Sequence, residues 1–245
     1  MSNKQPETRN KQPETDCVTS VSKPAANAAE PAAPAAAVAR QLLVFARPPV
    51  LGRVKTRLAA TLGPAQALRV YRRLLALTQQ AVAAAALPAT VWLAEAPAAE
   101  ALTTDAVPEL PEWPGLPWHL QTPAHDLGGR LAEAFAGAFA AGATQAAVIG
   151  TDCPGLTAAH LTQAFDELAA HDLVLGPAAD GGYYLLALRQ PQPALFQSIA
   201  WSSPTVLAET LAHAATLGLR VHLLPVLSDV DTEEDLTDWP ELLYG

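Results

Sequence analysis

The chain has 245 residues, half of them hydrophobic, so it can bury a substantial core within one domain of about 200 residues. Its formal net charge is −9, and an acidic chain without a long basic stripe argues against nucleic acid as a partner. Because it has only Cys17 and Cys153 and no run of about eighteen apolar residues, we expect a cytoplasmic protein with neither a disulfide framework nor a membrane span.

Residues 1–39 have the composition of a disordered extension. The segment Asn3–Thr8 is repeated as Asn10–Thr15, and an Ala/Pro-rich run follows from Pro24 to Ala39. Such a segment lacks the periodic large apolar residues that would offset the entropy lost on ordering. We therefore expect residues 1–39 to be disordered and residues 40–245 to form the folded domain.

From Gln41 onwards, short apolar runs alternate with longer helical stretches. The pattern predicts strands at 42–46, 90–94, 118–121, 146–150, 173–175, 183–188 and 219–224. It predicts helices at 64–86, from about 127, after Thr157, at 203–216 and from Thr232. This alternation indicates an α/β domain with a mostly parallel central sheet and helices on both faces. Ligands of such sheets lie beyond the carboxyl ends of the strands.

The loop after the first predicted strand concentrates positive charge. It holds four cations within eleven residues, namely Arg47, Arg53, Lys55 and Arg57. Gly52 would allow close approach of the backbone, Lys55 offers a compact ammonium, and arginine can hold phosphate oxygens in a fork. The loop does not follow the P-loop pattern. It is either a phosphate-binding loop or an ordinary solvated loop.

Asp152 follows the apolar strand at 146–150, and Pro154 and Gly155 come next. A carboxylate in this position can bind Mg²⁺, which takes one or two protein carboxylates and completes its shell with phosphates and water. The alternative is a turn-forming aspartate. The six histidines show no metal-ligand spacing, and we assign them no role.

A second group of acids lies near the C-terminus. Thr232 and Asp235 resemble a capping box, so the acids from Glu233 onwards are expected to be structural. Asp229 and Asp231 precede the cap and alternate along an extended segment. They should therefore face opposite ways, with at most one directed at the site.

Two glycine pairs complete the candidate residues. Asp180, Gly181 and Gly182 either form a hairpin turn or contact an acceptor or a sugar. Gly128 and Arg130 lie at the start of a predicted helix, where free amides and a guanidinium could approach a base or a phosphate.

Six ordered segments resemble the radical-SAM/selenodomain-associated transferase family, also described as an arsenosugar-biosynthesis type of glycosyltransferase. The resemblance extends from about residue 41 to residue 239. The segments are Leu42–Pro49, Gly52–Leu58, Asp126–Leu131, Gly150–Leu156, Asp180–Leu185 and Asp229–Thr232.

This resemblance implies a single GT-A, Rossmann-like domain of the nucleotide-diphospho-sugar transferase superfamily. By analogy, the basic loop would bind nucleotide phosphates, Gly128 and Arg130 would lie near the base, and Asp152 with Asp231 would hold Mg²⁺ or Mn²⁺. Asp180, Gly181 and Gly182 would lie on the acceptor side. The implied catalytic residues are Lys55, Asp152 and Asp180.

The resemblance leaves two reactions open. We expect transfer of a glycosyl group from a nucleotide-diphospho-sugar to a small acceptor. The segment Gly150–Pro154 has one acid where many GT-A glycosyltransferases have Asp-x-Asp, and in this it is similar to nucleotidyltransferases, including 2-phospho-lactate guanylyltransferase. The alternative is therefore nucleotidyl transfer from a nucleoside triphosphate to a phosphorylated or carboxylated acceptor. A non-catalytic nucleotide-binding protein is a third hypothesis.

Overall fold

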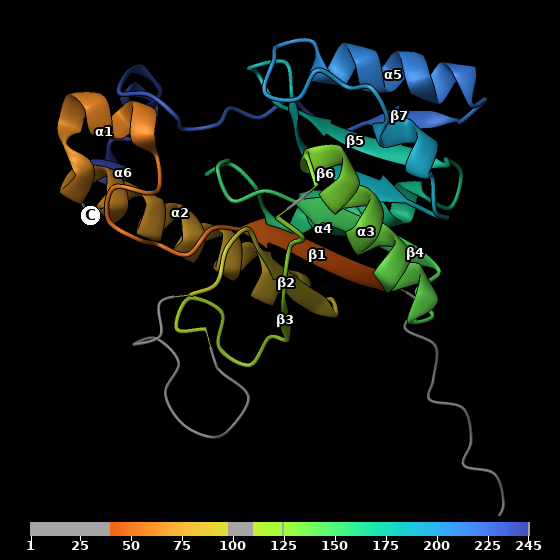
Figure 1. The fold of residues 1–245 in the computed structure, drawn as a ribbon, viewed down its shortest axis with the longest axis horizontal. Helices are drawn as coiled ribbons and strands as arrows, with labels where there is room; N and C mark the ends of the chain where they lie inside the picture. The colour runs from red at the N-terminus through yellow and green to blue at the C-terminus, as the bar shows by residue number, and fades with distance from the viewer. Residues whose placement is uncertain (1–39, 98–109, 124, 245) are drawn as a thin grey trace, which may run out of the picture. The chain divides into compact units, whose positions relative to one another are not determined.

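The computed structural model describes residues 40–97, 110–123 and 125–244, so the extension expected at residues 1–39 lies outside the described residues. Within them, seven strands form one sheet in the order β3-β2-β1-β4-β6-β5-β7 (Figure 1). The strands are β1 (Arg40–Ala46), β2 (Ala89–Leu93), β3 (Trp118–Leu120), β4 (Gln145–Ile149), β5 (Leu173–Pro177), β6 (Tyr183–Leu188) and β7 (Val221–Leu223). All pairings are parallel except those of β6, which runs antiparallel to both of its neighbours.

Helices cover both faces of the sheet because its strands carry apolar side chains on both sides. The helices are α1 (Thr56–Leu62), α2 (Pro64–Ala85), α3 (Leu127–Ala140), α4 (Ala158–Glu167), α5 (Val206–Thr216) and α6 (Glu241–Tyr244). Leu42 and Val44 of β1 belong to the core cluster under α2 and α4, whereas Leu43 belongs to the cluster under α3 and α5. A strand buried on both faces reads as a continuous apolar run, as this one does.

The reversed strand β6 matters for the position of its turn. Because β6 runs against the parallel strands, the connection from Pro177 to Tyr183 lies at the carboxyl edge of the sheet. The exits of β1, β4 and β7 lie at the same edge. The loops that carry the candidate residues are therefore neighbours in space.

The last predicted helix is wrong. Instead of a helix from Thr232, the chain makes a single 3-10 turn at Glu234–Thr237 and then the short helix α6. Pro240 explains the interruption, since a proline disfavours helical geometry in the residue before it. Helix α1, which follows the basic loop and ends at Gly63, is an element that the sequence pattern did not indicate.

None of the described helices combines the length and the apolar character needed to cross a lipid bilayer. The sequence expectation of no membrane span agrees with this finding.

We predict that Gly181→Ala destabilises the fold more than Gly218→Ala. Both glycines have positive φ, 91° and 68°, but a Cβ at Gly181 would collide with the backbone of Pro204, whereas a Cβ at Gly218 would meet open space. The free energy of unfolding should fall by about 2 to 5 kcal/mol for Gly181→Ala and by about 1 kcal/mol for Gly218→Ala. Urea denaturation of both variants measures this, and equal losses would contradict the close packing at Gly181.

Candidate active site

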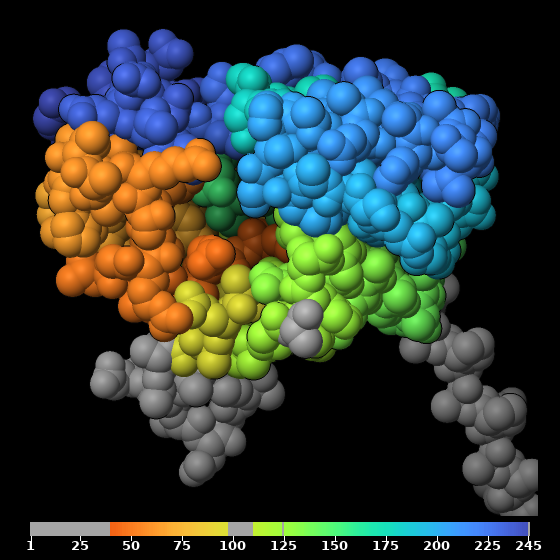
Figure 2. Space-filling model, turned by 45° about the horizontal axis from the view of Figure 1, so that its top comes forward, coloured from red at the N-terminus to blue at the C-terminus, as the bar shows by residue number. Residues whose placement is uncertain are grey.

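A cleft opens at the carboxyl edge of the sheet, where β1 and β4 end. Figure 2 shows the surface hollowed between the segment after β1, helix α3 and the chain leading to α5. The cavity has a volume of about 690 Å³, within the usual range for a small-molecule site. Its charged lining residues are Arg47, Arg53, Lys55, Arg57, Arg130, Asp152 and Asp231.

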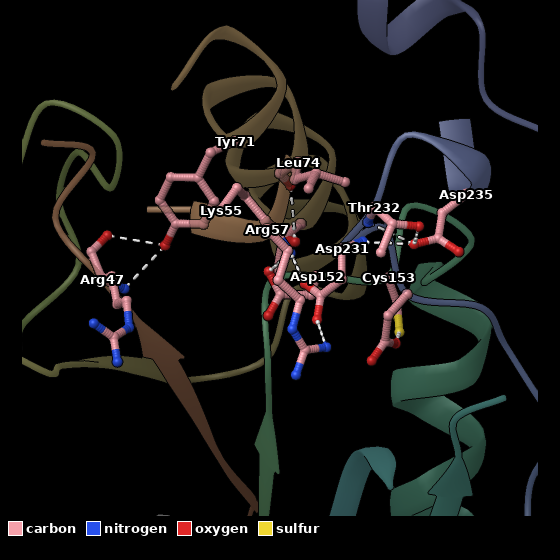
Figure 3. A network of polar contacts seen from close by, with 12 residues as sticks. Arg47, Lys55, Arg57, Tyr71, Leu74, Asp152, Cys153, Asp231, Thr232 and Asp235 are labelled. Atoms are coloured by element: carbon pink, nitrogen blue, oxygen red, sulfur yellow. Dashed lines mark hydrogen bonds and ion pairs between the residues drawn. The ribbon is translucent and has the colours of Figure 1, made fainter. Parts of the chain in front are cut away.

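Lys55 connects the two carboxylates of the cleft. Its Nζ lies 2.5 Å from Oδ1 of Asp152 and 2.8 Å from Oδ1 of Asp231 (Figure 3). The lysine side chain is only 5% exposed, whereas the two aspartates are 47% and 43% exposed. One buried cation therefore holds together residues 176 positions apart in the sequence.

Burial and charge act on Lys55 in opposite directions. Burial disfavours the ammonium and lowers its pKa, but Asp152 and Asp231 outweigh this effect, and the pKa of Lys55 is raised above its ordinary value. The lysine is therefore charged at neutral pH. Its backbone has φ 47° and ψ 51°, a left-handed conformation that is uncommon for a residue with a side chain.

Local hydrogen bonds fix the backbone that carries the two aspartates. The Val230 amide donates to the carbonyl of Asp152 at 3.0 Å, which joins the exit of β4 to the chain after β7. The carboxylate of Asp235 accepts from the amides of Asp231 at 2.9 Å and Thr232 at 2.7 Å. The expectation that Asp235 is structural is thereby confirmed.

Asp229 has a different environment from Asp231. Its carboxylate accepts a hydrogen bond from the buried Cys153 thiol at 2.5 Å. Burial raises the pKa of Asp229 to about 6, with contributions from nearby Asp180 and Asp152 that the Cys153 hydrogen bond and Lys55 partly oppose. Burial also raises the pKa of the Cys153 thiol, so it stays protonated. The two aspartates have separate partners, as their alternation predicted.

The arginines line the cleft with different degrees of restraint. Arg53 forms an ion pair with Glu95. Arg57 lies 3.6 Å from Asp231 and is 74% exposed. Arg130 donates from Nε to the carbonyl of His125 at 2.9 Å, at the start of α3. These guanidinium groups give the cleft a positive lining beyond the lysine that the aspartates neutralise.

The glycines of the sequence prediction do not line the cleft. Gly52 has φ 74° in the turn before Lys55, and Gly128 packs closely against Phe196 and Trp201. The Gly182 amide donates to the side chain of Asp180 at 2.8 Å within the β5–β6 hairpin. These contacts give each residue a structural reason, and their ligand roles remain predictions.

Sequence reasoning missed Tyr71 of α2. Its buried hydroxyl lies 3.0 Å from both the amide and the carbonyl oxygen of Arg47, so it secures the exit of β1. Burial raises the pKa of Tyr71. Tyr71 was interpreted as one apolar position of the helix. A phenol on a helix face turned to the core was the available signal, since a buried hydroxyl requires a partner.

Asp152 and Asp231 have the chemistry of a divalent-metal site. Both approach a single cation, Lys55, and both remain partly open to solvent. Mg²⁺ and Mn²⁺ prefer oxygen ligands, and Mg²⁺ usually retains several waters beside one or two carboxylates. The residues present therefore fit the metal expected from the sequence.

Comparisons with known proteins place this chain among transferases. The family described as "Uncharacterized protein conserved in bacteria (DUF2064)" matches residues 77–203. The phosphoenolpyruvate guanylyltransferase of Chloroflexus aggregans is 33% identical over 193 residues, which cover 76% of this chain and 90% of that protein.

Solved structures agree on the architecture. A protein from Desulfovibrio desulfuricans G20, provisionally described as a nucleotide-diphospho-sugar transferase, is 30% identical with a TM-score of 0.72, covering 80% of this chain and 84% of that one. The 4-diphosphocytidyl-2C-methyl-D-erythritol synthase of Anaerococcus prevotii is 9% identical with a TM-score of 0.53, covering 84% and 99%. The latter likeness concerns the fold alone. The predicted α/β fold class is confirmed.

We predict that Lys55→Met destabilises the metal-free protein far more than Arg57→Met. Without the ammonium, Asp152 and Asp231 face each other uncompensated, although their partial exposure moderates the repulsion. The free energy of unfolding should fall by about 1 to 3 kcal/mol for Lys55→Met and by less than about 0.5 kcal/mol for the exposed Arg57→Met. Urea denaturation in the presence of a chelator tests this; similar midpoints for the two variants would show that the buried ion pairs add no stability.

Proposed function

The chain belongs to the DUF2064 family, and we propose that it transfers a nucleotidyl group from a nucleoside triphosphate, first of all GTP, to a small phosphorylated or carboxylated acceptor. It is a transferase that uses a nucleotide-activated donor. The guanylyl and phosphoenolpyruvate specificities named for the Chloroflexus aggregans relative supply the donor and acceptor classes of the proposal.

The observation that carries the proposal is the charge arrangement around Lys55. A buried ammonium lies between two carboxylates at one end of a cleft that arginines line. A triphosphate needs such cations along its phosphates, because preorganised positive charge stabilises the leaving pyrophosphate. Arg53, Arg57 and Arg130 are the groups available to hold phosphate oxygens.

In the proposed step, an acceptor oxygen attacks the α-phosphorus of the triphosphate. The bond from that phosphorus to the bridging oxygen breaks, and pyrophosphate leaves with the electron pair. A phosphate or carboxylate acceptor is already ionised at neutral pH, so its oxygen needs no general base. Lys55 remains charged and faces the charge that develops on the leaving group.

Asp152 and Asp231 would hold Mg²⁺ or Mn²⁺, which when bound neutralises phosphate charge and orients the donor. Their open sides leave room for phosphate oxygens and water. Val230 and Asp235 fix the backbone near these two carboxylates, so the ligand positions exist before the ion arrives.

Glycosyl transfer is the second candidate, because the Desulfovibrio desulfuricans protein is described as a nucleotide-diphospho-sugar transferase. The six motifs support a finer proposal, membership of the radical-SAM/selenodomain-associated transferases. We place nucleotidyl transfer first because Asp152 is the one acid in Gly150–Pro154 and the guanylyltransferase aligns over most of its length.

Several sequence expectations continue as parts of the proposal. Asp180, Gly181 and Gly182 would approach the acceptor, and Gly128 with Arg130 would lie near the base. Residues 40–245 would form the catalytic domain in the cytoplasm.

We predict that GTP with Mg²⁺ or Mn²⁺ raises the melting temperature of the protein by about 5 to 10 °C at 100 times its dissociation constant. Nucleoside triphosphates should act more strongly than nucleotide sugars. Incubation with GTP and phosphoenolpyruvate should then release pyrophosphate, measured by ³¹P NMR. Stabilisation by nucleotide sugars alone, without pyrophosphate release, would favour glycosyl transfer, and no response to any nucleotide would refute both reactions.

We predict that Asp231→Asn abolishes metal-dependent nucleotide binding, whereas Asp229→Asn preserves it. Asp231 faces Lys55 and the cleft, whereas Asp229 is bound to Cys153. The loss of kcat/KM should be about 100-fold or more for Asp152→Asn and Asp231→Asn, in line with the removal of one electrostatic group from a transferase site. Calorimetry with GTP and Mn²⁺ separates the variants, and the reverse order would assign the metal to Asp229.

A further inference from the structure

Two histidines and a glutamate meet at the edge of the sheet opposite the cleft. They are Glu167 at the end of α4, His171 just before β5, and His222 within β7. One potential ligand atom from each lies within 4.8 Å of the others. All three side chains are between 27% and 31% exposed, so water and ions can reach them. Of the residues that the structure describes, these form the group with three such ligands.

The spacing of Glu167 and His222 suits a shared ion better than a hydrogen bond. The Glu167 Oε2 lies 3.5 Å from the His222 Nδ1, beyond the usual hydrogen-bond range of about 2.7 to 3.2 Å. In a tetrahedral Zn²⁺ site with bonds of about 2.0 to 2.2 Å, neighbouring ligand atoms are about 3.3 to 3.6 Å apart. The observed separation falls in that interval.

A backbone contact orients His171 in the manner of metal-binding imidazoles. Its Nδ1 lies 3.0 Å from the carbonyl oxygen of Glu167. Because a carbonyl only accepts, the neutral ring donates from Nδ1 and keeps its lone pair on Nε2. Ligating histidines commonly donate their second ring nitrogen to a backbone carbonyl or a carboxylate, which fixes the tautomer.

The neighbouring acid is engaged elsewhere. Asp172 accepts from Arg220 at 3.0 Å and 3.2 Å, and Arg189 lies 3.5 Å away. It is therefore no fourth ligand, and it offsets the positive charge of Arg220, which stands two residues before His222. Glu167 is left as the carboxylate that faces both imidazoles.

We propose that Glu167, His171 and His222 bind one Zn²⁺ ion, with water completing the coordination. Two imidazoles and one carboxylate form a known type of zinc ligand set, and imidazole also suits the other late first-row cations. This site is independent of the proposed transferase reaction, because its residues lie at the amino-terminal edge of the parallel strands.

The ion would fasten a vulnerable strand. β7 has three residues, lies at the end of the sheet and pairs along one side with β5. Short edge strands fray readily because half of their backbone groups lack a partner in the sheet. An ion shared by β7 and α4 would hold the strand whose continuation carries Asp231 to the cleft.

The test uses untagged full-length protein freed of metal by a chelator, with Asp152→Asn and Asp231→Asn introduced to remove the cleft carboxylates. Calorimetry with ZnCl₂ should show one equivalent bound, and Zn²⁺ at 100 times its dissociation constant should raise the melting temperature by about 5 to 10 °C. Absence of zinc binding to this protein would overturn the proposal.

The matched variants in the same background are His222→Gln and His119→Gln, because the two histidines are the central residues of the edge strands β7 and β3. His222→Gln should weaken zinc binding at least 100-fold, and His119→Gln should leave it unchanged. Equal binding by the two variants would place the ion elsewhere. If circular dichroism shows that His222→Gln is unfolded, Glu167→Gln decides by the same comparison.

Discussion

The architecture of the cleft depends on one buried ammonium. Lys55 contacts the carboxylates of Asp152 and Asp231, which come from the exits of β4 and β7, while Lys55 itself follows β1. Its burial would be unfavourable without these partners, because an unpaired charge away from water is costly. The left-handed backbone at Lys55 is a further local cost, of the kind that persists at functional sites where the surrounding contacts determine the geometry.

The sheet makes this meeting possible, and smaller contacts fix it. Parallel strands bring their carboxyl ends to one edge, so residues far apart in sequence become neighbours. Tyr71 secures the chain beyond β1, and Asp235 binds the amides of Asp231 and Thr232. The Val230 amide then ties the last loop to Asp152. Each carboxylate therefore stands on a backbone held by a neighbouring element rather than on a free loop.

Local pattern predicted the strands, most helices and the loops of the cleft, because apolar periodicity and turn residues act over short distances. It could not show that Lys55 would be buried between Asp152 and Asp231, since that contact depends on the strand order. The Cys153–Asp229 pair and the role of Tyr71 are tertiary in the same sense. Glu167 and His171 are four residues apart, but His222 joins them only because β7 pairs with β5. For the last helix, the capping signal at Thr232 was real, but Pro240 limited what followed.

Under the proposed function, the same ion pairs require metal and nucleotide to bind together. In the structure, Lys55 satisfies Asp152 and Asp231, so an incoming cation meets a positive charge and an incoming phosphate meets two carboxylates. A metal–nucleotide complex removes both conflicts, because its cation attracts the aspartates and its phosphates attract Lys55 and the arginines. Such coupling is reciprocal: the factor by which metal tightens nucleotide binding equals the factor by which nucleotide tightens metal binding. The buried lysine would thus make each partner's affinity conditional on the other, and would disfavour occupation of the cleft by either alone.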